Sequence, residues 1–366
     1  MTFWLNSCPT TYFSLYMLIM PSQFTCAPYL LPNKPSKGDN IMWGESNAVV
    51  FSNSVLGART EKYADYFDIC AAIVGFVPST GVHRSENRKP SIIIDATSFI
   101  REHLLDTLDE KHVYESGIDS FFPAMGWLSG NLSDGRIPLI LGFDLLPSVS
   151  RDNLKAFCAA FGTTGSSPLF HMANITPEAM GNNLIGDMMQ YCGERRIKVS
   201  KADVVEAIMT LDSGRDSGDD ISLVALGNPH LSVEEMKNLI DIISLDDRPK
   251  HDSVKLIATL GRQIQSDGDK MGYTKRLEAF GVTLINDTCW CMLLHPPIIP
   301  SANPSAKILT NSGKYAHYGP GLTNCNIRFG SMYQCIEAAK SGRMGPNRMS
   351  WLRLFSTRTL IRRMIR

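Results

Sequence analysis

Short apolar runs rich in β-branched residues alternate with amphipathic segments along most of this chain, and this alternation restricts the fold more than any other feature. Amphipathic segments repeat apolar residues at helical spacing, and they cover residues 201–211, 233–244, 273–280 and 332–340. The apolar runs have the length of buried strands, and they cover residues 91–95, 137–143, 221–226, 254–259, 282–285 and 307–310. Together they predict α/β layers with mainly parallel sheets and flanking helices.

The charge balance of the chain argues against two classes of partner. Lys plus Arg and Asp plus Glu each number 36, so the chain has no net positive charge that would attract nucleic acid. The apolar stretch 12–20 is much shorter than the roughly 20 residues of a membrane span. We therefore expect neither a nucleic acid nor a membrane as partner, although the basic end of the chain could form an amphipathic surface helix.

The nine cysteines, at positions 8, 26, 70, 158, 192, 289, 291, 325 and 335, are an odd set without regular spacing. This disfavours a disulfide framework and predicts a reducing compartment, the cytoplasm. Each thiol is then either a small core hydrophobe or a soft metal ligand. Cys289 and Cys291 could point the same way from extended chain, and zinc binding by them with His295 is one hypothesis, although a fourth ligand is lacking.

Polar segments follow three of the predicted strands, at residues 227–232, 286–291 and 311–320. The carboxyl ends of strands in an open parallel sheet face the ligand crevice, so His230, Lys314 and His317 are candidate site residues. Lys314 could hold an acidic group as a point charge.

Segment 44–59 carries polar residues on an otherwise apolar helical pattern. They could bond locally, or they could bind a carboxylate through neutral donors and a guanidinium fork. These residues are Ser46, Asn47, Asn53, Ser54 and Arg59.

Several long strings resemble the aconitase X family, also described as phosphomevalonate dehydratase large-subunit-like. They are TCAPYL at 25–30, WGESNAVVFSNSVLGART at 43–60, ENRKP at 86–90, LFHMANITPEA at 169–179, GNPHLS at 227–232, FGVTLINDTC at 280–289, NSGKYAHYGPGL at 311–322 and RFGSMYQCIEAAKSGR at 328–343. The resemblance covers about residues 25–343. It implies an aconitase-like catalytic core that dehydrates a small hydroxy acid, either cis-3-hydroxy-L-proline or mevalonate 5-phosphate.

The same resemblance implies an iron–sulfur cluster, 2Fe-2S or 4Fe-4S, held by three cysteines from separate loops. The matching positions are Cys26, Cys289 and Cys335, with Cys291 as the alternative ligand. Lys314 and His317 would be catalytic, and the substrate would be bound by Ser46, Asn47, Asn53, Ser54, Arg59 and His230.

Departures from the family pattern bear on activity. Family members use a small swivelling domain or subunit that would supply a serine base, and they have a longer N-terminal part, so we expect a truncated large subunit or fragment that needs this partner. The expected organisation is a divergent segment 1–24, two core lobes at 25–212 and 213–343 divided near the polar stretch 212–220, and a basic tail 344–366. The alternative is a non-catalytic remnant or binding protein that retains the fold.

Overall fold

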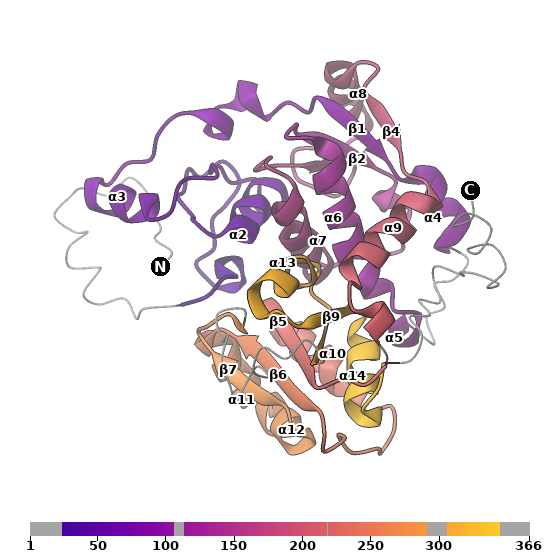
Figure 1. Cartoon of the computed structure of the whole chain (residues 1–366). Helices are drawn as coiled ribbons and strands as arrows, with labels where there is room; N and C mark the ends of the chain where they lie inside the picture. The colour runs from indigo at the N-terminus through magenta and orange to yellow at the C-terminus, as the bar shows by residue number, and fades with distance from the viewer. Residues whose placement is uncertain (1–23, 106–112, 218, 291–305, 345–366) are drawn as a thin grey trace.

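Two all-parallel sheets form the framework of the protein in this computed structural model, which describes residues 24–105, 113–217, 219–290 and 306–344 (Figure 1). The first sheet has the order β3-β2-β1-β4 and consists of β1 (Ile92–Asp95), β2 (Pro138–Leu141), β3 (His171–Met172) and β4 (Arg196–Lys198). The second has the order β7-β6-β5-β8-β9 and consists of β5 (Leu223–Leu231), β6 (Lys255–Leu260), β7 (Thr283–Asn286), β8 (Lys307–Thr310) and β9 (Asn326–Phe329). All six predicted strands are confirmed, and so is the parallel α/β class.

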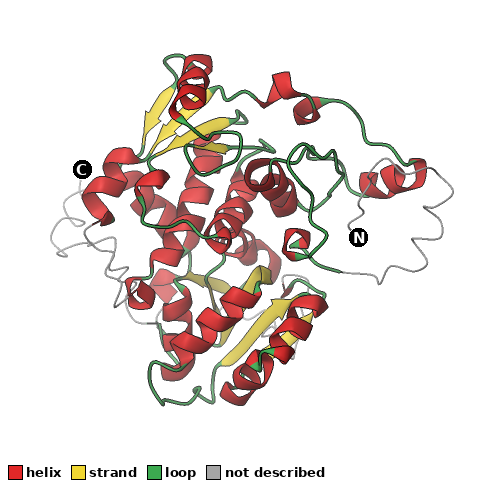
Figure 2. Ribbon diagram, turned by 180° about the vertical axis from the view of Figure 1, so that it is seen from behind, coloured by secondary structure: helices red, strands yellow, loops and turns green. Residues whose placement is uncertain are grey.

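Helices fill three layers around these sheets (Figures 1 and 2). Between the sheets lie α6 (Phe121–Ser133), α7 (Arg151–Thr164), α9 (Lys201–Leu211) and α13 (Gly313–Thr323). The outer face of the first sheet is covered by α8 (Asn182–Cys192). The outer face of the second is covered by α10 (Val233–Ile243), α11 (Arg262–Lys270), α12 (Tyr273–Phe280) and α14 (Met332–Ser341). The four predicted helices correspond to α9, α10, α12 and α14.

Strand residues alternate between the layers. In β5, Leu223 and Ala225 belong to the core between the sheets, whereas Val224 and Leu226 belong to the core under the outer helices. Ile94 of β1 likewise faces inward while Ile93 faces α8. A strand covered on both faces needs apolar residues at every position, which explains the uninterrupted apolar runs in the sequence.

The remaining helices lie in different parts of the molecule (Figure 1). Helix α4 (Thr97–His103) follows β1, α5 (Val113–Ser116) packs against α14, and α3 (Phe67–Val74) lies away from both sheets. Helix α2 (Ser46–Phe51) continues directly into a π-type turn, Ser52–Leu56, a geometry that is frequent near functional sites. Apart from Phe24 and Met344, the predicted terminal segments 1–24 and 344–366 lie outside the described residues.

The polar stretch 212–220, where we placed the division between lobes, is anchored at its start. The Asp212 side chain is buried, its Oδ1 lies 2.7 Å from Arg328 Nε, and it also accepts a hydrogen bond from the backbone N–H of Phe329. Both charged side chains are 3% exposed. The ion pair therefore ties β9 of the second sheet to the end of α9.

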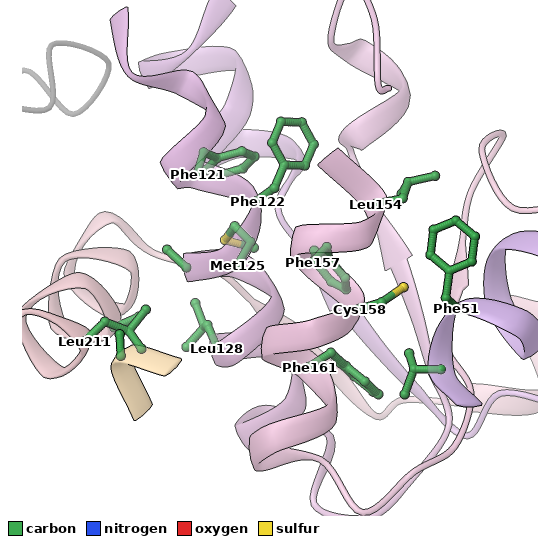
Figure 3. Packing of buried hydrophobic residues seen from close by; sticks show 14 of the residues in the cluster. Phe51, Phe121, Phe122, Met125, Leu128, Leu154, Phe157, Cys158, Phe161 and Leu211 are labelled. Atoms are coloured by element: carbon green, nitrogen blue, oxygen red, sulfur yellow. The ribbon is translucent and has the colours of Figure 1, made fainter. Parts of the chain in front are cut away.

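Helices α6 and α7 cross at very short range in the layer between the sheets (Figure 3). A Cβ atom placed on Gly126 would lie 2.3 Å from the carbonyl oxygen of Phe157, and one on Gly130 would lie 2.7 Å from that of Phe161. Phe121, Met125 and Leu128 pack beside this crossing from α6. Glycine at these two positions is thus required by the approach of the backbones.

We expect Gly126→Ala to destabilise the protein by about 1–3 kcal/mol or more, because the backbone of α7 must move to admit the methyl group. Gly186→Ala on α8 is the matched control, since nothing lies within 4 Å of its added Cβ, and it should stabilise the protein by about 0.5–1 kcal/mol. Urea unfolding measures both. Equal effects of the two substitutions would contradict the packing described for α6 and α7.

Candidate active site

The order of the second sheet creates a crevice at its carboxyl edge. From β5 the chain moves outward to β6 and β7, and then returns to add β8 and β9 on the other side of β5. Loops that leave such a switch point diverge and open a crevice. His230 lies at the end of β5, Cys289 follows β7, and Lys314 lies in the first turn of α13 after β8.

Two cysteines from distant segments meet at this edge. Thr25 packs against the end of β6, with its Cβ 3.6 Å from a Cβ position on Gly261, and this brings Cys26 to the crevice. The side chains of Cys26 and Cys289 are hydrogen-bonded to each other. This contact, followed by burial, holds the pKa of Cys26 well above its usual value. The structure thus brings together two of the three predicted cysteine ligands, and without a cation Cys26 stays protonated.

His230 joins the two segments that carry these thiols. Its Nδ1 lies 3.0 Å from Thr25 Oγ1, and its Nε2 lies 2.8 Å from the carbonyl oxygen of Thr288. Its backbone N–H donates to Cys26 Sγ at 3.3 Å. Burial lowers the pKa of the imidazole, so His230 is neutral near pH 7. We predicted His230 as a substrate ligand, and the structure places both of its ring nitrogens against the protein.

A charged pair lies beside the thiols. Lys314 Nζ bonds to Glu45 Oε1, and Glu45 also caps α2 through the backbone N–H of Asn47. Burial alone would lower the pKa of Lys314, but the charge of Glu45 and its hydrogen bond to Lys314 together oppose this effect, and the pKa is raised. Cys26 and Cys289 are near enough to add to this effect. Lys314 is therefore a fixed cation that is only 13% exposed.

Asn47 connects this charged pair to the cysteine segment. Its Nδ2 donates at 3.0 Å to both the Cys26 carbonyl and Glu45 Oε1, and its Oδ1 accepts from Tyr29 at 2.7 Å. Ser46 lies next to it and donates to Glu45 Oε1 at 3.4 Å. The predicted residues Ser46 and Asn47 thus lie beside the charged pair and the Cys26 segment. Glu45 and Tyr29 were missed, although Glu45 stands within the quoted GESN string.

A buried charged cluster is hydrogen-bonded to the backbone of His230. Lys155 is 2% exposed and donates to the carbonyl of His230 at 3.0 Å, and its Nζ bonds to Glu235 and lies 3.5 Å from Asp152. Burial opposes the charge of Lys155, but both carboxylates raise its pKa. The sequence gives no sign of this cluster, because its members come from two helices, α7 and α10, that are far apart in the chain.

His317 lies one turn beyond Lys314 on α13 and is exposed. Trp127 Nε1 donates to its Nδ1 at 3.1 Å, so the neutral ring carries its proton on Nε2. Partial burial lowers the pKa of His317. The ring is thus oriented by α6, with its Nε2–H directed away from that contact.

Three other predicted residues are hydrogen-bonded within the protein. Asn53 bonds to the backbone of Thr60 and Pro168, and Ser54 accepts from the backbone of Phe170. Arg59 donates to the carbonyl of His83 at 2.7 Å and to Ser85 Oγ at 2.8 Å. These contacts tie segment 44–59 to chain segments around residues 83–85 and 168–170.

Cys335, the third predicted metal ligand, is fully buried on α14 in the core under the outer helices. Burial, with the nearby Asp119 carboxylate, raises its pKa well above the usual value. Among the described residues, no three His, Cys, Asp or Glu side chains form a group that could hold a metal ion. Cys291 and His295 lie outside the described residues.

Three family models match consecutive parts of the chain: the first domain of aconitase X at residues 12–86, the second at 90–209 and the third at 221–341. The crystal structure of the holo-form of Thermococcus kodakaraensis aconitase X superposes with a TM-score of 0.70 at 27% identity, over 89% of this chain and 75% of that chain. The chain belongs to the aconitase X family, and the predicted aconitase-like core is confirmed.

Curated relatives carry two names. Cis-3-hydroxy-L-proline dehydratases of Hypocrea jecorina and Pseudomonas aeruginosa are 42% and 41% identical, over 87% and 90% of this chain and 50% and 52% of their own length. A phosphomevalonate dehydratase large subunit of Methanocaldococcus jannaschii is 31% identical over 86% of this chain and 70% of its own. The chain thus spans about half the length of the first two. Among the described residues no helix is both long and apolar enough to cross a membrane.

Asp119 generates a prediction about pH. Burial raises the pKa of this carboxyl to about 6 from 3.8, although it accepts a hydrogen bond from the backbone N–H of Met332. The folded state binds this proton more tightly than the unfolded state, so its contribution to stability is present below pH 4 and is lost as pH rises through about 6. Relative to Asp119→Asn, the free energy of unfolding of the wild type should fall by about 2–3 kcal/mol between pH 4 and pH 7. Parallel profiles for both proteins in urea titrations would refute this assignment.

Proposed function

We propose that this chain is the large catalytic part of an iron–sulfur-dependent hydro-lyase that removes water from a small hydroxy acid. The observation that carries the proposal is the convergence of two thiols and a lysine–glutamate pair at the carboxyl edge of the second sheet. Relatives that are named dehydratases support the reaction type. The reaction takes place in the cytoplasm, where thiols stay reduced.

The substrate in this proposal is cis-3-hydroxy-L-proline, with mevalonate 5-phosphate as the second candidate. The cis-3-hydroxy-L-proline dehydratases are 41–42% identical to this chain, whereas the M. jannaschii phosphomevalonate dehydratase large subunit is 31% identical. Both compounds are small hydroxy acids with a carboxylate. A fixed cation such as Lys314 suits that shared group.

The donor set fits an iron–sulfur group in part. Cys26 and Cys289 supply two converging soft ligands, which thiolate-bound iron prefers. The resemblance assigns Cys335 as the third, although the structure buries it on α14, and Cys291 is the alternative. When bound, an iron centre with an open position would act as a Lewis acid on the departing hydroxyl group.

The residues of this chain bind and orient the acid. Lys314 holds the substrate carboxylate and stabilises the negative charge that develops when the neighbouring proton leaves. Lys314 stays cationic at neutral pH, so it does not act as the base. His317 donates from Nε2 to the substrate, since Trp127 occupies its Nδ1. The proton acceptor is the serine of a small swivelling domain or subunit of the same family, which works as the partner.

Metal uptake tests the ligands. Anaerobic reconstitution with iron and sulfide should give visible absorption in the wild type and in Cys70→Ser, whose thiol is exposed on α3. Cys26→Ser and Cys289→Ser should each lose most of the bound iron, because two remaining thiolates hold a cluster poorly. Separate Cys335→Ser and Cys291→Ser variants identify the third ligand. Unchanged uptake in Cys26→Ser or Cys289→Ser would overturn the assignment.

Substrate loss tests the reaction. The reconstituted chain mixed with a family small subunit should consume cis-3-hydroxy-L-proline, and Lys314→Met should lower kcat/KM at least about 100-fold while iron uptake persists. Lys314→Arg keeps the charge and should recover part of the activity. A wild type that binds iron but consumes neither candidate acid would leave a binding protein as the better interpretation.

A further inference from the structure

The imidazole of His230 makes one hydrogen bond to each of two segments that are 263 positions apart in the chain, counted from Thr25 to Thr288. Each bonded residue immediately precedes a cysteine. Thr25 precedes Cys26, and Thr288 precedes Cys289. A single buried side chain therefore reaches both neighbours of the thiol pair.

The geometry assigns the protons on this ring. The carbonyl oxygen of Thr288 can only accept, so Nε2 of His230 donates to it at 2.8 Å. Nδ1 then accepts from the hydroxyl of Thr25 at 3.0 Å, while that hydroxyl oxygen accepts from the backbone N–H of Ala27 at 3.1 Å. The network is complete with one proton on the ring.

We propose that His230 is a positioning residue that clamps the Thr25-Cys26 and Thr288-Cys289 segments together and so sets the approach of the two thiols. Both ring nitrogens are engaged by the protein, which leaves neither for a substrate. This role replaces the substrate-binding role that we predicted from the sequence. It concerns the thiol pair whatever reaction the site performs.

His230 is itself held rigidly. Its side chain is almost wholly buried, and its carbonyl accepts from Lys155 at 3.0 Å. Lys155 is fixed in turn by Glu235 and Asp152. His230 is thus fixed by Lys155 of α7, in the layer of helices between the sheets, and not only by the two loops that it joins.

Two substitutions of His230 each keep one of its two side-chain hydrogen bonds and remove the other. The Oδ1 of Asn takes the place of Nδ1, so His230→Asn keeps the bond to Thr25 and loses that to Thr288. The amide nitrogen of Gln reaches the place of Nε2, so His230→Gln keeps the bond to Thr288 and loses that to Thr25. His230→Ala loses both, and all three retain the backbone bond to Cys26.

The experiment measures the alkylation rate of each cysteine by iodoacetamide in the reduced, metal-free full chain, with mass spectrometry to resolve the sites. His230→Asn should raise the rate of Cys289 relative to Cys26 about fivefold, and His230→Gln should shift the ratio about fivefold the other way, as expected when one hydrogen bond is lost. His230→Ala should raise both rates.

Global destabilisation is excluded by internal controls. Cys158 and Cys335 are buried in the two large cores, and their rates should not change. Should the His230 variants label these core thiols, Thr25→Val tests the clamp without altering the histidine. It should free Cys26 as His230→Gln does, and Thr25→Ser should restore the wild-type ratio.

The proposal is overturned if the ratio of the Cys289 to the Cys26 alkylation rate changes in the same direction in His230→Asn and His230→Gln. It is also overturned if this ratio changes in neither variant. Wild-type labelling in Thr25→Val overturns it as well. The measurement uses no substrate and no iron, so a failure of the dehydration assay leaves it unaffected.

Discussion

The pairing of β5 with β6 on one side and with β8 on the other is the constraint on which the candidate site depends. Parallel strands present all their carboxyl ends at one edge, and the reversal of strand order at β5 separates the loops that follow. His230, Cys289 and Lys314 reach this edge from three different strands. Thr25 closes the arrangement by packing on the end of β6.

Charges at this edge are tolerated because each has a partner. An isolated buried ion costs several kcal/mol, and this cost is offset only by a close opposite charge and further hydrogen bonds. Lys314 has Glu45, and Lys155 has Glu235 and Asp152. Both clusters lie near Cys26, whose thiol interacts electrostatically with Glu45, Lys314 and Lys155. The polar groups are therefore in place before any ligand arrives.

Sequence patterns predicted the strands well and the site unevenly. Apolar runs identified β1, β2, β5, β6, β7 and β8, but β3 and β4 are too short to stand out, and Asn326 and Arg328 interrupt the apolar pattern of β9. Helix α6 was missed because it is buried on nearly all sides and shows no polar face. Ser46, Asn47, Lys314 and both site cysteines were predicted because local strings resemble the family. The roles of His230, Lys155 and Tyr29 arise from contacts across the whole chain, which no local pattern reveals.

The ion pair between Asp212 and Arg328 bears on how the two halves of the molecule come together. A buried pair adds little net stability, yet separating its members leaves two bare charges in a dry interior. The pair therefore favours a single position of β9 relative to the end of α9, because a displaced arrangement would leave a buried charge without its partner.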